Sequence, residues 1–286
     1  MDMDEQYPNN IVGSKSFTAV AINCAAKAGE WIKTKAGTVT QLDTKYSMHD
    51  LVTEVDKGSE RMIRNLIATH FPSHSFLGEE GVGPGPEASA KAIERVSDAE
   101  YVWIVDPVDG TTNYVHGFPF FSVSIALAHR GQVIVGVIYD PMRDELFVAE
   151  RGKGAYVHGR KMKVSPELTL AQSLVATGFP ADHRAALPAN LKGIQAIAPQ
   201  VRNLRISGSA ALHLAYVAAG RLSGFWEIGL SAWDIAAGAL LVEESGGHLS
   251  DTEGKPYHLG VRNIVATNGH IHDELVVALG QAGAAG

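Results

Sequence analysis

Apolar residues recur at helical spacing near the start of the chain. From Ser14 to Ile32 they fall three or four positions apart, which predicts an amphipathic helix capped by Ser14 or Ser16. A second stripe of this kind predicts a helix over residues 57–70. Residues 78–89 are rich in glycine and proline and are therefore expected to form a loop.

Shorter apolar runs predict strands further along the chain. Residues 101–106 are almost entirely apolar, as in a strand that is buried on both faces. Residues 121–129 and 132–139 are joined by an Arg-Gly pair, which predicts a β-hairpin, and residues 146–149 are expected to add a strand.

The second half of the chain contains both kinds of element. Strands are predicted at residues 174–177 and 224–227, and helices at residues 187–197, 210–219 and 235–245. The chain is therefore expected to have a mixed α/β (α+β) fold.

No long polar linker divides the chain, so residues 14–275 are expected to form one unit of two coupled halves. The halves would be residues 14–155 and residues 156–275. The ends, residues 1–13 and 276–286, are expected to be poorly ordered tails.

The composition is that of a globular protein with a substantial core, with 286 residues, of which 45% are hydrophobic and 19% charged. The formal net charge of −7 disfavours direct binding of nucleic acid, which requires a basic surface. It also means that any anion site must be made positive locally, by metal ions or by backbone amides.

Cys24 is the only cysteine, so no disulfide can form within the chain and the reducing cytoplasm is the expected location. The first ten residues are acidic and polar and lack the layout of a signal peptide. No apolar run approaches the roughly 18 residues of a membrane-spanning helix, so no membrane partner is expected.

The run WIVDPVDGTTN (residues 103–113) carries the clearest chemistry. Asp106 ends the predicted buried strand, and Pro107 restricts the backbone so that Asp109 turns back towards Asp106. Two adjacent carboxylates at a strand end repel each other, and a divalent cation removes the conflict. Mg²⁺ is favoured because it prefers oxygen ligands, and no cysteine or histidine cluster at metal-binding spacing points to zinc.

Taken singly, each acidic residue also has a structural explanation. Asp109-Gly110 is a common turn dipeptide, Asp234 precedes a helix that it would cap, and Glu79 lies in a glycine-rich segment where charges are usually solvated. It is their combination in one sequence that favours a metal site.

The residues after Asp109 predict a phosphate-binding turn. Gly110 lets the backbone approach a ligand closely, and if a helix or tight turn starts here, the amides of Gly110 and Thr111 point at an anion. The competing phosphate motifs are missing, because the chain has no G-x-x-x-x-G-K-[ST] and prolines interrupt GVGPGP.

Taken together, four motifs resemble those of the inositol monophosphatase family. They are DLVTEVD (residues 50–56), GEE (78–80), DPVDGTTN followed by FPFFSVSIAL (from residue 106) and WDIAAGALLVEESGG (233–247). They occur in the family's order and at roughly its spacing, over residues 14–275. The resemblance implies a layered αβαβα sandwich, a homodimer, and a Mg²⁺-dependent, lithium-sensitive phosphatase.

The resemblance also implies a ligand set for two to three Mg²⁺ ions. One ion would be held by Glu79, Asp106 and the backbone carbonyl of Val108. A second would be held by Asp106, Asp109 and Asp234, and a third, weaker ion would lie near Glu79. Glu79 would thereby also take part in catalysis.

The remaining site residues follow from the same resemblance. Thr111 would hydrogen-bond the nucleophilic water with Asp56 behind it, and the amides of Gly110 and Thr111 would bind the phosphate. Glu227 would accept hydrogen bonds from inositol hydroxyls, with Ala210 beside the ring. Asp109 and Asp234 would contact the substrate as well, and Lys45 would border the site.

The expected reaction is direct, in-line attack of a metal-activated water on phosphorus, with inositol monophosphate as the first candidate substrate. Other small sugar or polyol phosphates, and fructose 1,6-bisphosphate, NADP, 3′-phosphoadenosine phosphate and histidinol phosphate, remain alternatives. An alternative of another class is a protein-interaction role in transcription, as in some bacterial relatives of the family.

Overall fold

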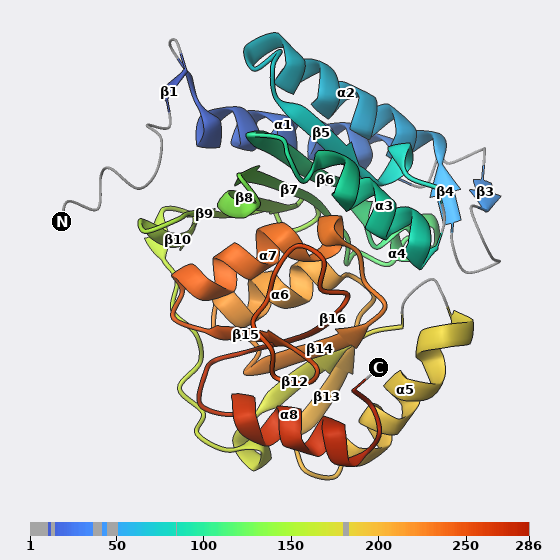
Figure 1. Ribbon diagram of the computed structural model, residues 1–286, viewed down its shortest axis with the longest axis vertical. Helices are drawn as coiled ribbons and strands as arrows, with labels where there is room; N and C mark the ends of the chain where they lie inside the picture. The colour runs from blue at the N-terminus through green and yellow to red at the C-terminus, as the bar shows by residue number, and fades with distance from the viewer. Residues whose placement is uncertain are drawn as a thin grey trace.

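The computed structural model describes residues 11–12, 15–36, 42–44, 51–83, 85–179 and 183–285. Helices and sheets alternate in layers through this part of the chain (Figure 1). Helices α1 (Phe17–Lys35) and α2 (Glu54–His70) cover the outer face of one sheet, and α6 (Ala210–Ala218) and α7 (Ala232–Glu244) separate it from a second sheet. Helices α5 (His183–Ile197) and α8 (His272–Gln281) cover the far face of that second sheet. The mixed α/β class and the αβαβα layering are confirmed.

Among the described residues, the first sheet has seven strands in the order β11-β10-β9-β8-β7-β6-β5. Their bounds are Ser75–Gly78 (β5), Tyr101–Asp109 (β6), Ser122–His129 (β7), Gln132–Asp140 (β8), Glu145–Glu150 (β9), Gly154–Val157 (β10) and Arg160–Lys161 (β11). Strands β5 and β6 are parallel, and the other neighbours are antiparallel. Arg130 and Gly131 join β7 to β8 with φ of 49° and 80°, so the predicted hairpin is confirmed.

The second sheet has five strands in the described chain, in the order β13-β12-β14-β16-β15. Their bounds are Leu174–Thr177 (β12), Asn203–Ile206 (β13), Gly224–Ile228 (β14), His248–Asp251 (β15) and Asn263–Thr267 (β16). β12 runs parallel to β13 and β14, and the remaining pairs are antiparallel. Two short pairs complete the strands, β1 (Ile11–Val12) with β2 (Lys15–Ser16) and β3 (Leu42–Thr44) with β4 (Leu51–Thr53).

The helices begin where local capping groups allow. Ser16 is the N-cap of α1, and its hydroxyl accepts a hydrogen bond from the backbone N–H of Ala19 at 3.1 Å. α2 starts three residues before its predicted position because Thr53 and Asp56 form a capping box. The second-half helices are found as predicted to within a few residues.

The predicted loop at residues 78–89 was partly wrong. It holds a 3₁₀ turn, Glu79–Gly81, and the start of helix α3 (Pro86–Val96). Pro86 lies in the first turn of α3, where backbone N–H groups make no intrahelical hydrogen bond, so its lack of an N–H costs nothing there. Its fixed φ also suits a helix. A proline that indicated a loop in the sequence therefore begins a helix.

The C-terminal segment expected to be a tail is largely part of the packed unit. α8 continues to Gln281, and the side chains of Leu279 and Ala284 are fully buried. Residues 1–10 and 13, where poor order was expected, lie outside the described residues.

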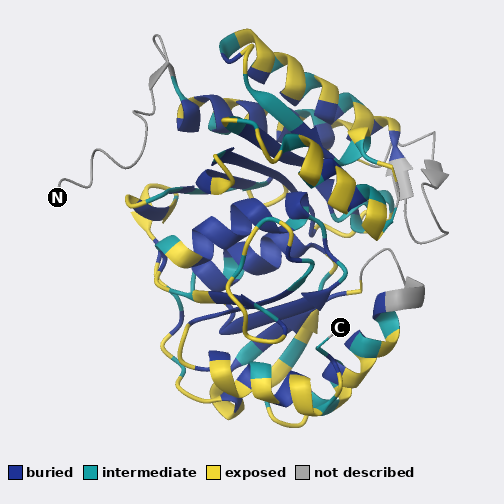
Figure 2. Ribbon diagram, in the orientation of Figure 1, coloured by how far each residue is buried: buried dark blue, intermediate teal, exposed yellow. Residues whose placement is uncertain are grey.

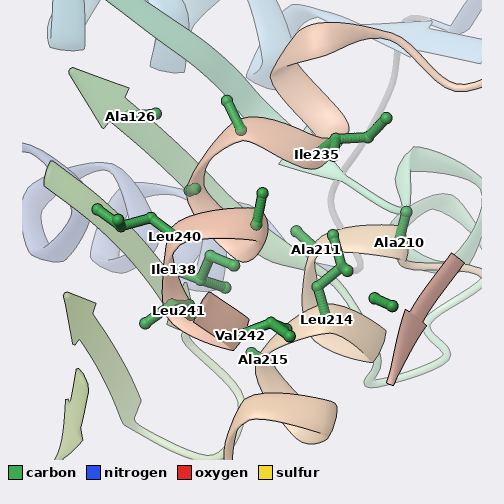
Figure 3. Close-up of a cluster of buried hydrophobic side chains, with 14 of the residues drawn as sticks. Ala126, Ile138, Ala210, Ala211, Leu214, Ala215, Ile235, Leu240, Leu241 and Val242 are labelled. Atoms are coloured by element: carbon green, nitrogen blue, oxygen red, sulfur yellow. The ribbon is translucent and has the colours of Figure 1, made fainter. Parts of the chain in front are cut away.

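The middle layer connects the two sheets. α6 and α7 are buried on almost all sides, and Figure 2 shows them as a dark-blue band between the sheets. Their sequences are accordingly apolar all round rather than striped. Leu240 and Leu241 of α7 lie in one apolar cluster with Leu214 of α6 and Ile138 of β8 (Figure 3).

α7 crosses β8 at Gly136, where the two backbones lie too close together for a side chain. A Cβ on Gly136 would lie 2.6 Å from the backbone oxygen of Ala237. Because a backbone atom cannot rotate away as a side chain can, this contact sets how deeply α7, and Asp234 at its start, sits against the first sheet.

We expect Gly136→Ala to lower the free energy of unfolding by roughly 1–3 kcal/mol, the usual cost of overpacking a core, as measured by urea denaturation. The matched control is Gly58→Ala in α2, whose Cβ would be in ordinary contact, 3.5 Å from the Trp31 ring. The control should keep or raise stability because alanine is the better helix former. A Gly136→Ala protein as stable as the wild type would contradict the close crossing of α7 and β8.

Candidate active site

A bulge in β6 places Asp106 and Asp109 on the same face of the first sheet. Asp106 pairs with Ser124 of β7 and Asp109 with Ser122, so three steps along β6 match two along β7. Residues three apart in a regular strand face opposite sides, and the extra residue of the bulge corrects this. The predicted strand end at Asp106 was wrong, because β6 continues to Asp109; both carboxylates are buried, 3% and 7% exposed.

Asp234 reaches the same place from the first turn of α7. It forms a capping box with Ser231, whose backbone N–H donates to Asp234 Oδ2 at 2.7 Å. One carboxylate oxygen from each of Asp106, Asp109 and Asp234 lies within 4.8 Å of the others. The fold thus brings together acidic groups from distant parts of the chain.

Glu79 lies beside this cluster. It starts the 3₁₀ turn after β5, and its carboxyl group interacts with that of Asp106. Glu60 of α2 supports the turn by accepting a hydrogen bond from the backbone N–H of Glu80 at 2.8 Å. Glu80 thus helps to fix the turn through its backbone N–H group.

Burial and mutual repulsion raise the pKa values of the clustered carboxylates. For Asp106, burial is the largest cause and the charges of Glu79, Asp109 and Asp234 add to it. The pKa of Asp234 is also raised, mostly by burial and next by the negative charge of Asp109. In the described part of the chain, no lysine or arginine forms an ion pair with these aspartates. The described residues therefore supply the cluster with no compensating positive charge.

Asp109 also joins the two halves of the molecule. Its Oδ2 accepts hydrogen bonds from the Ser209 hydroxyl and from the backbone N–H of Ala211 at 2.9 Å. Its Oδ1 accepts from the backbone N–H of Ala210 at 3.3 Å. A carboxylate of the first sheet therefore caps the N-terminus of α6, where it also meets the positive end of the helix dipole.

Thr111 and Asp56 form a hydrogen-bonded pair. Thr111 Oγ1 lies 3.0 Å from Asp56 Oδ1 and 3.0 Å from the carbonyl oxygen of Val108. The other oxygen of Asp56 accepts from the backbone N–H of Thr53 at 2.9 Å and from its hydroxyl at 2.5 Å. Burial raises the pKa of Asp56 despite these bonds. Because the Thr111 hydroxyl has one hydrogen to donate, its oxygen retains lone pairs for a donor such as water.

The turn after Asp109 has the form that the sequence suggested. Gly110 has φ of 98°, which favours glycine, and α4 (Thr111–Val115) begins directly after it. Asn113 donates through Nδ2 to the carbonyl of Phe120 at 2.7 Å and to that of Ser207 at 2.6 Å. The turn is therefore tied to both halves of the molecule.

Glu227 and Ala210 lie at the border of the acidic cluster. Glu227 comes from β14 and is 5% exposed; its pKa is raised well above the usual range by burial and then by the charges of Asp234 and Asp109. No residue in the described chain donates a hydrogen bond to its carboxylate. Ala210 is buried and touches the cluster through its backbone N–H. Lys45 lies outside the described residues.

Sequence reasoning missed two serines that position the aspartates. Ser231-x-x-Asp234 matches the capping-box pattern and could have been found in that way. Ser209 binds Asp109 across 100 positions of the chain, so no local pattern could predict the contact.

The chemistry of the donor set fits a hard divalent cation. All the converging donors are oxygens, from Asp106, Asp109 and Asp234, with Glu79 and the Val108 carbonyl beside them. A cation would remove the repulsion that now raises the carboxylate pKa values. Elsewhere in the described chain, no three histidine, cysteine or acidic side chains lie close enough to share an ion.

Comparison with known proteins points the same way. A model of the inositol monophosphatase family matches residues 14–283. The chain is 44% identical over 270 residues to inositol monophosphatase 2 of Solanum lycopersicum, covering 94% of this chain and 99% of the relative. It is 42% identical over 257 residues to Nus factor SuhB of Pseudomonas aeruginosa, with 87% and 90% covered. The crystal structure of extragenic suppressor protein suhB from Bartonella henselae matches with a TM-score of 0.82 at 41% identity, covering 91% of this chain and 96% of that one.

Replacing Asp106 with asparagine tests the electrostatics of the cluster. Asparagine keeps the shape, removes one buried charge and supplies N–H donors, so without metal we expect Asp106→Asn to raise stability by roughly 1–2 kcal/mol, or a few degrees in Tm. Added Mg²⁺ should raise the Tm of the wild type and leave that of the variant almost unchanged.

The control for this experiment is Asp98→Asn, which changes an exposed carboxylate. It should leave both the metal-free Tm and its rise with Mg²⁺ as in the wild type. If Mg²⁺ stabilises Asp106→Asn as strongly as the wild type, the ion does not bind at this cluster.

Proposed function

The chain belongs to the inositol monophosphatase family and is a phosphoric monoester hydrolase, and from this premise we propose that inositol monophosphate is its main substrate and Mg²⁺ its metal ion. The observation that carries the proposal is the convergence of buried Asp106 and Asp109 with partly buried Asp234, without a cationic partner among the described residues. Such a site attracts divalent cations, and through them a phosphate ester that an acidic protein would otherwise repel.

The same residues define the proposed ligand set. Glu79, Asp106 and the Val108 carbonyl would hold one ion, and Asp106, Asp109 and Asp234 a second, with a third, weaker ion near Glu79. The Val108 carbonyl oxygen has two lone pairs and would keep at least one for a metal, whether the single Thr111 hydroxyl hydrogen points to it or to Asp56. When bound, the cations supply positive charge that neutralises the phosphate oxygens and lowers the pKa of water.

Thr111 and Asp56 would orient the attacking water. The Thr111 hydroxyl can donate to Asp56 Oδ1, which leaves its oxygen to accept a hydrogen bond from water. Asp56 is held by Thr53 at the start of α2 and its pKa is raised, so it can accept a proton near neutral pH more readily than an exposed aspartate. This pair would fix the direction of an in-line attack on phosphorus.

The phosphate would lie at the turn after Asp109. The amides of Gly110 and Thr111 come before the first hydrogen-bonded turn of α4 and have no intrahelical acceptor. They would donate to the non-bridging phosphate oxygens. Gly110 also permits this close approach, since it has no side chain.

Glu227 supports a polyhydroxylated leaving group. Its carboxylate is buried near Asp109 and Asp234 yet receives no hydrogen bond from the described residues. Hydroxyl groups of inositol would supply the missing donors, with Ala210 against the ring and Asp109 and Asp234 near the leaving oxygen. A buried acceptor of this kind discriminates against substrates that lack hydroxyls.

A panel of phosphate esters tests the substrate assignment. We expect kcat/KM with Mg²⁺ to be higher for inositol 1-phosphate than for fructose 1,6-bisphosphate, NADP, 3′-phosphoadenosine phosphate or histidinol phosphate. Asp234→Asn serves as the blank, because it removes a proposed metal ligand but keeps the capping box with Ser231. A preference for nucleotides, or ordinary Mg²⁺-dependent activity in the blank, would reject the substrate or the metal assignment respectively.

The similarity to Nus factor SuhB of Pseudomonas aeruginosa favours one second candidate, a protein-interaction role in transcription. The net charge of −7 disfavours direct nucleic-acid binding, so such a role would involve protein contacts. Capture of transcription proteins by the inactive Asp234→Asn variant would support this role independently of catalysis.

We also propose that the protein is a homodimer in the cytoplasm. Phe118, Met142 and Ile206 are large apolar side chains 51%, 40% and 46% exposed, and a second copy would cover them. Hydrogen bonds connect the segments that carry them. Asn113 bonds with both Phe118 and Ser207, and the Arg143 side chain donates to the Pro119 carbonyl. None of the described helices combines the length and the apolar character needed to cross a bilayer.

Light scattering tests the dimer. We expect twice the chain mass of 30.5 kDa, and we expect Ile206→Asp to halve the measured mass because a buried, unpaired carboxylate opposes association. A monomeric wild type would contradict the proposal.

A further inference from the structure

Gly178 and Glu227 lie side by side at the ends of two neighbouring strands. β12 and β14 are parallel, with Ala176 opposite Phe225. Continuing this register by two residues brings Gly178, just after β12, next to Glu227. Both residues are buried.

The Glu227 carboxylate occupies the space that a side chain at position 178 would need. A Cβ on Gly178 would lie 2.1 Å from Oε2, 2.5 Å from Cδ and 2.7 Å from Oε1 of Glu227, and these are its three nearest neighbours. Gly178 is not among the glycines with positive φ, so its backbone conformation is open to other residues. The absence of a side chain here is therefore a matter of space.

No hydrogen bond or opposite charge in the described chain holds this carboxylate in place. It receives no hydrogen bond there, and the nearest charges, Asp234 and Asp109, repel it. The carboxylate therefore packs directly against the backbone of Gly178, in the space left by the missing side chain. In this position both of its oxygens remain able to accept hydrogen bonds.

We infer that Gly178 is a specificity-determining position, which keeps the Glu227 carboxylate where it can accept hydrogen bonds from hydroxyl groups of the leaving alcohol. The inference rests on the proposed function, because it takes Glu227 as the group that receives those hydroxyls. The substrate class selected in this way is phosphate esters of polyhydroxylated alcohols, in preference to esters whose alcohol carries no further hydroxyl.

Gly178→Ala tests this role because the atoms nearest to its new methyl group belong to the far end of a flexible side chain, that of Glu227. The protein should fold, with the Glu227 carboxylate displaced. We expect kcat/KM for inositol 1-phosphate to fall by about tenfold, the order of hydrogen bonds to a charged group. For phenyl phosphate, whose leaving group has no other hydroxyl, we expect a change within about twofold, because the cluster of Asp106, Asp109 and Asp234 is untouched.

A double-mutant cycle with Glu227→Ala shows whether Gly178 acts through the carboxylate. If Gly178 acts through the carboxylate, adding Gly178→Ala to Glu227→Ala should change kcat/KM for either substrate by no more than about twofold. If the two effects were additive instead, they would have separate causes. Gly280→Ala, at an exposed helical position with no neighbour within 4 Å of the new Cβ, is the matched control and should behave as the wild type.

The outcomes separate the inference from the function on which it rests. If Glu227→Ala loses the preference for inositol 1-phosphate but Gly178→Ala keeps it, the role of Gly178 is wrong and the proposed function stands. Three other results would also overturn the role of Gly178. They are equal losses of kcat/KM on both substrates, unfolding of Gly178→Ala seen by circular dichroism, and an undiminished effect of Gly178→Ala in the Glu227→Ala background. If Glu227→Ala changes no preference, the substrate assignment itself fails.

Discussion

The structure depends on the repulsion among clustered carboxylates and on what holds them together against it. Asp106, Asp109 and Asp234 each offer an oxygen within 4.8 Å of the others, and of the three side chains the first two are buried and the third is partly buried. Repulsion at such distances would drive the segments apart if the side chains were free. Each acid is instead fixed by backbone N–H groups, such as Val108 for Asp106 and Ser231 for Asp234. The site is therefore prepared for positive charge by the protein backbone itself.

The same acids connect the site to the fold. Asp109 caps α6 from the opposite half, and Asp234 caps α7, the helix that packs against β8 in the middle layer. A metal that binds these carboxylates would therefore also draw together the first sheet and the middle helices. Around this centre, the proposed function gives Gly110 and Glu227 different roles, since the Gly110 amide would donate to a phosphate and the Glu227 carboxylate would accept from an alcohol. Reaction and selectivity would then depend on separate groups around one cluster.

Much of the fold could be predicted from the chain, because apolar spacing and glycine turns are local signals. The hairpin at Arg130-Gly131 and the first two helices are examples. Helix α3 could not be recognised, because a proline at a helix start looks like a loop signal. Strands β13, β15 and β16 were missed because short strands within a sheet depend on neighbours distant in sequence.

The acidic motifs singled out side chains that the fold brings together, but the geometry that joins them could not be predicted from local patterns. The bulge between Asp106 and Asp109 depends on pairing with β7, and Ser209 reaches Asp109 across the chain. An anomalous difference map from a crystal of the wild-type protein grown with Mn²⁺ shows whether divalent cations bind at the cluster. We expect one peak in contact with Asp106, Asp109 and Asp234 and another beside Glu79 and the Val108 carbonyl. A map in which Mn²⁺ binds elsewhere while this cluster remains without a peak would contradict this expectation.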